Sequence, residues 1–135
     1  MRIAVRYYTK TGHTKMLADA IAEAVGVEAK EINVPLEEDV DILFLGSAVY
    51  ATQLDSAVKN FIDGISVNVG KLVNFSSAAI LNGTYKQVKA VAEANNIPVA
   101  DEEFFCKGAF KFVAKGRPNA QDCADAAEFA KKFLA

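Results

Sequence analysis

Residues 40–45 read Val-Asp-Ile-Leu-Phe-Leu and are apolar at every position except Asp41. A strand with this pattern has no polar face, so it is typical of a parallel strand that other layers cover on both sides. The run ends at Gly46-Ser47, which indicates that the chain turns there. A layered α/β fold with a buried parallel sheet is therefore the architecture that this segment favours.

Strand-like and helical segments alternate along the rest of the chain. The expected strands are 3–8, 27–34, 40–45, 72–81 and one within 97–105. The expected helices run through 17–25, 57–65, 88–92 and 120–134, the last with Asn119 as its cap. This order predicts an open parallel α/β sheet, and right-handed crossovers leave few topologies for it. We expect residues 1–135 to form one domain, because a chain of this length can bury a full core.

Composition and charge exclude several classes of protein. The net charge is −2 and the charged residues are spread along the chain, so we expect no nucleic-acid partner and no anionic membrane surface. The first apolar run contains Arg6 and is too short for a signal peptide or a membrane span, which favours a cytoplasmic protein. Cys106 and Cys123 lack metal-ligand spacing, so we expect two reduced thiols and no metal. The acidic run 37–39, with Asp41, is expected to be a solvated loop.

A loop rich in hydroxyl groups joins the first expected strand to the first expected helix, and it reads Thr9-Lys10-Thr11-Gly12-His13-Thr14. The first N–H groups of a helix have no partner within the helix and carry the positive end of its dipole, which suits a phosphate. The loop matches neither GxxxxGK[ST] nor GxGxxG, so a small phosphomonoester is a better ligand than a nucleoside triphosphate or a dinucleotide. From these residues alone, simple capping of the helix by threonine and glycine is an equally good explanation.

Residues 5–21 resemble the FMN signature of flavodoxins. The matching positions carry an aromatic ring, two hydroxyls, a glycine and two apolar helix residues, namely Tyr7, Thr9, Thr14, Gly12, Ala18 and Ile21. Arg6 and His13 depart from the signature, in which an apolar or aromatic residue and an asparagine are common. Residues 40–50 are similar to the third strand and first flavin-flanking loop of that family, and residues 104–119 to the C-terminal part of short bacterial flavodoxins.

The resemblance implies a flavodoxin-like open parallel five-stranded sheet in the order 2-1-3-4-5, with helices on both faces. It also implies FMN as the noncovalent cofactor, with its phosphate held by Thr9, Lys10, Thr11, Gly12, His13 and Thr14. The isoalloxazine ring is then expected to stack on Tyr50, with Ala48, Val49 and Ala51 along its edge. The opposite wall is expected to consist of Asn82, Gly83, Thr84 and Tyr85.

The function that the resemblance implies is electron transfer between redox partner proteins by a monomer that has no catalytic residue of its own. Two departures from electron-carrying flavodoxins are the absence of glycine from residues 47–55 and the weak net charge. Two alternatives stay open: an FMN-dependent NAD(P)H:quinone-type reductase, and a flavodoxin-like domain that has lost FMN. A phospho-acceptor receiver domain is disfavoured, because Thr9-Lys10 and Gly46-Ser47 stand where it needs acidic residues.

Overall fold

The computed structural model of the chain describes residues 1–10, 12–48, 54–78, 84–107 and 118–134. The strands are β1 (Ile3–Tyr7), β2 (Ala29–Glu31), β3 (Val40–Ala48), β4 (Val69–Ala78) and β5 (Phe104–Lys107). The helices are α1 (His13–Val25), α2 (Ser56–Asp63), α3 (Tyr85–Ala94) and α4 (Ala120–Lys131). All neighbouring strands are parallel and their order is β2-β1-β3-β4-β5, so the expected sheet is confirmed.

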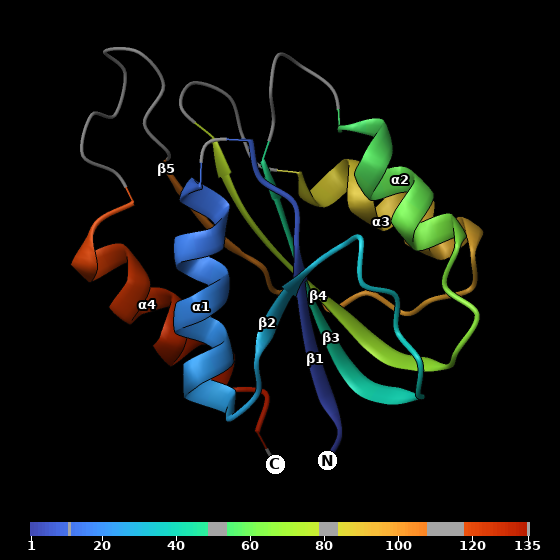
Figure 1. Cartoon of the computed structure of the whole chain (residues 1–135), viewed down its shortest axis with the longest axis horizontal. Coiled ribbons are helices and arrows are strands. Elements are labelled where there is room, and N and C mark those ends of the chain that lie inside the picture. The colour runs from blue at the N-terminus through green and yellow to red at the C-terminus, as the bar shows by residue number, and fades with distance from the viewer. Residues whose placement is uncertain (11, 49–53, 79–83, 108–117, 135) are drawn as a thin grey trace.

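Helices cover both faces of this sheet (Figure 1). α1 and α4 lie side by side on one face, where Leu17 and Phe129 pack with Phe44 and Phe75 of the strands. α2 and α3 lie on the other face, where Val58, Ile62 and Val88 pack with Leu43, Leu45 and Leu72. Successive strand residues point to opposite faces, and Ile42, Leu43, Phe44 and Leu45 are all buried. Burial on both sides thus explains the nearly continuous apolar pattern of residues 40–45.

The helix ends follow local chemistry that the sequence indicates. α1 ends before Gly26, which has a φ of 80° and donates its N–H to the carbonyls of Ala22 and Glu23. Asn119 caps α4 as expected: its Oδ1 accepts the Asp122 N–H at 3.0 Å, and Asp122 Oδ2 accepts the Asn119 N–H at 2.9 Å. None of the helices in the described ranges has the length and apolar content that crossing a membrane requires.

The connection from β2 to β3 differs from the expected pattern. β2 has only three residues, and residues 32–39 cross from one side of β1 to the other without forming a helix. Arg6 of β1 is buried against this crossover, where its Nε donates to the Val34 carbonyl at 2.8 Å and its Nη2 to the Pro35 carbonyl at 3.4 Å. The guanidinium therefore bonds carbonyls of an irregular segment that has no helix or sheet partners for them. Burial lowers the pKa of Arg6.

The last two strands also have shifted ends. β4 begins at Val69, three residues before the expected start, and its first residues pair with β3. β5 begins only at Phe104, because residues 97–103 join β4 through the single bridge between Leu72 and Val99. Because the strands are parallel, the carboxyl ends of β1, β3 and β4 lie at one common edge of the sheet.

Candidate functional site

The carboxyl edge of the sheet, at the top of Figure 1, brings together three strand ends. In the sheet register, Tyr7 of β1 lies opposite Gly46 of β3, and Gly46 lies opposite Phe75 of β4. The loop that begins at Thr9 therefore starts beside the end of β3. The connection that leaves β1 leads to β2 on one side, and the connection that leaves β3 leads to β4 on the other side. In open α/β sheets, ligands bind at the edge where the connections part in this way.

The turn between β1 and α1 has a backbone that favours an anion. Gly12 is the N-cap of α1 with φ 88° and ψ −6°, and its N–H donates to Thr9 Oγ1 at 2.9 Å. A Cβ at Gly12 would meet no other atom, so lack of space is not the reason for a glycine here. The reason is the positive φ, which glycine adopts without strain. The cap has no side chain to accept from the first-turn N–H groups, and the described first turn carries no acidic residue. The start of α1 therefore has no capping side-chain bond and no carboxylate in its first turn, and its positive dipole end favours an anion.

Two cationic or titratable side chains lie on this turn. Lys10 is exposed, and its Nζ is 3.5 Å from Asp55 Oδ2. Asp55 caps α2 by accepting the Ala57 N–H at 2.9 Å, and this bond lowers the pKa of Asp55, with smaller contributions from Tyr8 and Lys10. His13 is half-buried at the start of α1. The ion pair links the β1–α1 turn to the start of α2.

Thr14 lies deeper than the other described residues of the turn. It is fully buried, and its Oγ1 is 3.3 Å from the Oγ of Ser77, which is 2% exposed at the end of β4. The sequence prediction placed Thr14 in the site but did not include Ser77. The sequence signal for Ser77 was a pair of adjacent serines near the end of a mostly apolar strand, directly before a predicted flavin-flanking loop.

A second buried hydroxyl cluster lies on the opposite face of β4. Thr84 caps α3 and is fully buried, and its Oγ1 accepts from Ser47 Oγ at 2.8 Å and from Asn74 Nδ2 at 3.2 Å. Its N–H donates to Ser76 Oγ at 3.3 Å. Only Thr84 of this cluster was a predicted site residue. Asn74 also reaches Glu103 Oε1 at 3.4 Å; burial raises the pKa of Glu103, and this bond partly opposes the shift.

The remaining predicted residues are placed in part. The Tyr85 hydroxyl donates to the Ala100 carbonyl at 2.8 Å, beside Leu72, and therefore points away from the carboxyl edge. Of Ala48, the structure describes the backbone as the last residue of β3. The other predicted positions lie outside the described residues, namely Thr11, Val49, Tyr50, Ala51, Asn82 and Gly83. The predicted stacking on Tyr50 stays a prediction.

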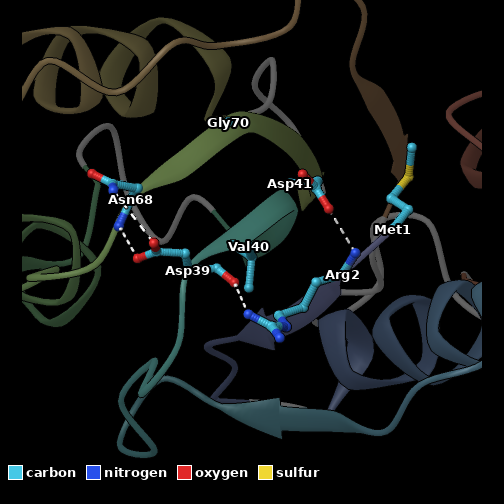
Figure 2. A pocket seen from close by; sticks show the side chains of 7 residues that line it. All are labelled: Met1, Arg2, Asp39, Val40, Asp41, Asn68 and Gly70. Atoms are coloured by element: carbon cyan, nitrogen blue, oxygen red, sulfur yellow. Dashed lines mark hydrogen bonds between the residues drawn. The ribbon is translucent and has the colours of Figure 1, made fainter.

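Two hollows flank the sheet at opposite edges. A groove of about 450 Å³ beside the β1–α1 turn is lined by the ends of β1 and β2 and by α2, including Tyr8, Thr9 and Phe61. A larger hollow of about 680 Å³ lies at the amino edge (Figure 2).

In the amino-edge hollow, polar groups bond to one another. Arg2 N–H donates to Asp41 Oδ2 at 2.7 Å, and Asn68 N–H donates to Asp39 Oδ1 at 2.9 Å. Asp39 and Asp41 are exposed, as expected for a solvated loop, but they also fasten β1, β3 and the segment before β4. We therefore assign these bonds a structural role and do not regard the hollow as the ligand site, since ligands of such sheets bind at the carboxyl edge.

Comparison with known proteins bears on the fold. No protein-family model matches the sequence, and a search among curated proteins finds no match. Among solved structures, oxidised flavodoxin 1 from Bacillus cereus superposes with a TM-score of 0.75 at 16% identity, and the match covers all of both chains. The chain has a flavodoxin-like fold.

Other structures agree with this flavodoxin-like fold. A flavodoxin from the domain Archaea matches with a TM-score of 0.73 at 15% identity, over 98% of this chain and 95% of that chain. A flavodoxin from Megasphaera elsdenii matches with a TM-score of 0.65 at 21% identity, over 96% and 98% of the two chains. In the flavodoxin-like fold of this chain, the β1–α1 turn and the ends of β3 and β4 form the candidate site.

Proposed function

We propose that the chain binds FMN noncovalently at the carboxyl edge of the sheet and passes electrons between redox partner proteins. The observation that carries this proposal is the β1–α1 turn, in which Gly12 opens α1 without a capping side-chain bond or an acidic residue in the first turn of the helix. Such a helix start attracts a phosphate through its N–H groups and its dipole. The flavodoxin-like fold supports FMN as the phosphate ester.

The groups present fit the two ends of FMN. The phosphate would lie against the turn formed by Thr9, Lys10, Thr11, Gly12, His13 and Thr14, where Lys10 adds positive charge. Thr9 would act mainly by holding the Gly12 N–H and thereby the shape of the turn. The ring would lie between Tyr50, with Ala48, Val49 and Ala51, and a wall formed by Asn82, Gly83 and Thr84. The Tyr85 side chain would not belong to this wall, because its hydroxyl bonds to the Ala100 carbonyl away from the carboxyl edge. FMN supplies the redox chemistry when it is bound, and the protein binds, orients and shields it.

Partners and location are part of the same proposal. A net charge of −2 gives weak electrostatic steering, so we expect association with redox partners to depend little on ionic strength. We propose that the protein acts as a monomer in the cytoplasm. Cys106 and Cys123 do not form a disulfide, which is compatible with a reducing compartment.

The test is calorimetric titration of the apoprotein with FMN and with riboflavin, which lacks the phosphate. We expect one FMN per chain and an affinity for riboflavin that is about 10- to 100-fold weaker, as loss of charged hydrogen bonds predicts. Equal affinity for the two ligands would contradict the phosphate site, and binding of neither would favour a domain that has lost FMN. Rapid NAD(P)H oxidation with a quinone acceptor would favour the reductase alternative over the electron carrier.

A further inference from the structure

The contact between Thr14 and Ser77 joins two elements that are distant in sequence. Thr14 lies in the first turn of α1 and Ser77 near the end of β4, 63 positions later, with 3.3 Å between their hydroxyl oxygens. Neither side chain has an appreciable exposed fraction. Water therefore cannot replace either hydroxyl as the partner of the other, and loss of one leaves a buried polar group with this bond unmade.

The place of this pair in the fold gives it a specific consequence. Thr14 belongs to the turn that we propose for the phosphate, whereas β4 leads into the residues that we propose for one wall of the flavin ring. The pair is thus a direct bond between the phosphate end and the ring end of the site. Ser76 points to the other face of β4 and bonds the N–H of Thr84 at the start of α3. Adjacent serines therefore fasten two different helix starts to one strand.

We propose that Ser77 is a positioning residue which, through Thr14, fixes the first turn of α1 relative to the end of β4. The pair would thereby set the separation between the phosphate subsite and the ring subsite and would favour a flavin that carries a phosphate on its ribityl chain. This inference rests on the proposed function. FMN occupies both subsites at once and is sensitive to their separation, whereas riboflavin occupies only one, because rigid placement matters most for a ligand held at both ends.

The experiment compares variants that remove the bond with one that keeps it. Thr14→Val and Ser77→Ala each remove a hydroxyl, whereas Thr14→Ser keeps the hydroxyl and removes only a methyl group. In calorimetric titrations of the apoproteins, we expect both removals to weaken FMN binding about three- to tenfold and to leave riboflavin binding unchanged. Thr14→Ser should retain the FMN affinity of the unmodified protein. The double variant Thr14→Val/Ser77→Ala should bind FMN no more weakly than either single variant, since both break one bond.

Ser76→Ala is the matched control, because Ser76 is equally buried next to Ser77 but bonds to α3. We expect it to change the affinities for FMN and riboflavin by one common factor, so that their ratio is preserved. A preserved ratio in Ser77→Ala, or additive losses in the double variant, would overturn the inference while leaving the proposed function intact. If the unmodified protein binds FMN and riboflavin equally, the proposed function itself fails. If Ser77→Ala does not fold, Ser77→Cys decides the question, because it keeps nearly the same volume and weakens the bond to Thr14; an unchanged ratio of FMN to riboflavin affinity in this variant would overturn the inference.

Discussion

Gly46 is a position of the sheet that has no room for a side chain. It lies opposite Phe75 in the register of β3 and β4, and the Phe75 ring is fully buried. A Cβ at Gly46 would overlap the Cε2 and Cζ atoms of that ring. Gly26 presents the opposite case, because a Cβ there would meet open space but its φ of 80° disfavours any other residue. The two glycines are therefore required for different reasons.

We predict that Gly46→Ala lowers the free energy of unfolding by about 1–3 kcal/mol, as is usual when a packed core receives an extra methyl group. The variant Gly46→Ala/Phe75→Leu should be more stable than the sum of the two single changes implies, because the smaller side chain relieves the overlap. Urea unfolding of the four proteins in this cycle measures the coupling. As a control, Gly26→Ala should cost about 1–2 kcal/mol and show no coupling with Phe75→Leu. Additive effects at Gly46 and Phe75 would contradict the packing argument.

For single residues, the sequence predicted the β1–α1 turn more completely than it predicted the buried polar residues of β4 beside the site. Thr9, Gly12 and Thr14 stand in one local signature, which can be read without knowledge of the fold. Ser77 and Asn74 could not be assigned this way, because their partners Thr14 and Thr84 become neighbours only when the sheet and helices assemble. Polar residues at buried strand positions were the visible signal, and the sequence does not show which residue each one contacts.

Among the elements, the crossover 32–39 is the clearest departure from expectation. The alternating pattern of residues 27–34 fits a strand, yet β2 ends at Glu31 and Val34 N–H turns back to the Glu31 carbonyl at 3.0 Å. Periodicity alone cannot show where a strand leaves a sheet, since the crossover residues must also bury apolar side chains such as Leu36. The structure gives Arg6, a departure from the flavodoxin signature, a role in supporting this crossover.

We predict that Arg6→Lys lowers the free energy of unfolding by about 1–2 kcal/mol, because an ammonium group cannot reproduce the directed bonds of the guanidinium to Val34 and Pro35. Thermal unfolding provides the measurement. Arg2→Lys is the matched control, because Arg2 also donates to a carbonyl, that of Asp39 at 3.1 Å, but its side chain is 58% exposed, so water can replace that bond. That control should change stability by less than about 0.5 kcal/mol. Equal losses at the two positions would argue against a supporting role for Arg6.

For the molecule as a whole, the described carboxyl groups make stability depend on pH, and Glu103 acts in the unusual direction. Burial raises its pKa, so the folded protein holds this proton more tightly than the unfolded chain does. Its contribution is neutral below the unfolded pKa of about 4.3 and becomes destabilising as the pH rises through the folded pKa. Ionised Glu103 therefore lowers stability at neutral pH.

We predict that Glu103→Gln raises the melting temperature at pH 7 and that the gain disappears below about pH 4, where glutamate is protonated in both states. The glutamine oxygen can still accept from Asn74, so the substitution tests the charge and keeps the hydrogen bond. Melting curves of both proteins between these pH values provide the comparison. A gain that does not vary with pH would mean that charge burial is not the cause.

For the whole molecule, the layered sheet could be predicted from the sequence, whereas the polar bonds that join its strand ends could not. Apolar strand patterns and alternating helices indicated a parallel α/β sheet, and the flavodoxin resemblance implied the strand order that the structure confirms. The hydrogen bonds at the amino edge depend on Arg2, Asp39 and Asn68. These residues are exposed and polar, so in the sequence they resemble ordinary loop residues. Their arrangement follows from the assembled strand ends.

The paired serines of β4 bear on which parts of this fold can be exchanged in a chimera. Because Ser76 accepts from the Thr84 N–H at the start of α3 and Ser77 bonds Thr14 in α1, a graft of an all-apolar strand in place of β4 would remove the partners of the Thr84 N–H and of the Thr14 hydroxyl at the same time. The strand and the two helix starts must therefore be exchanged together, although they are far apart in the sequence. A working hybrid with another flavodoxin-like domain must take positions 14, 76, 77 and 84 from a single parent.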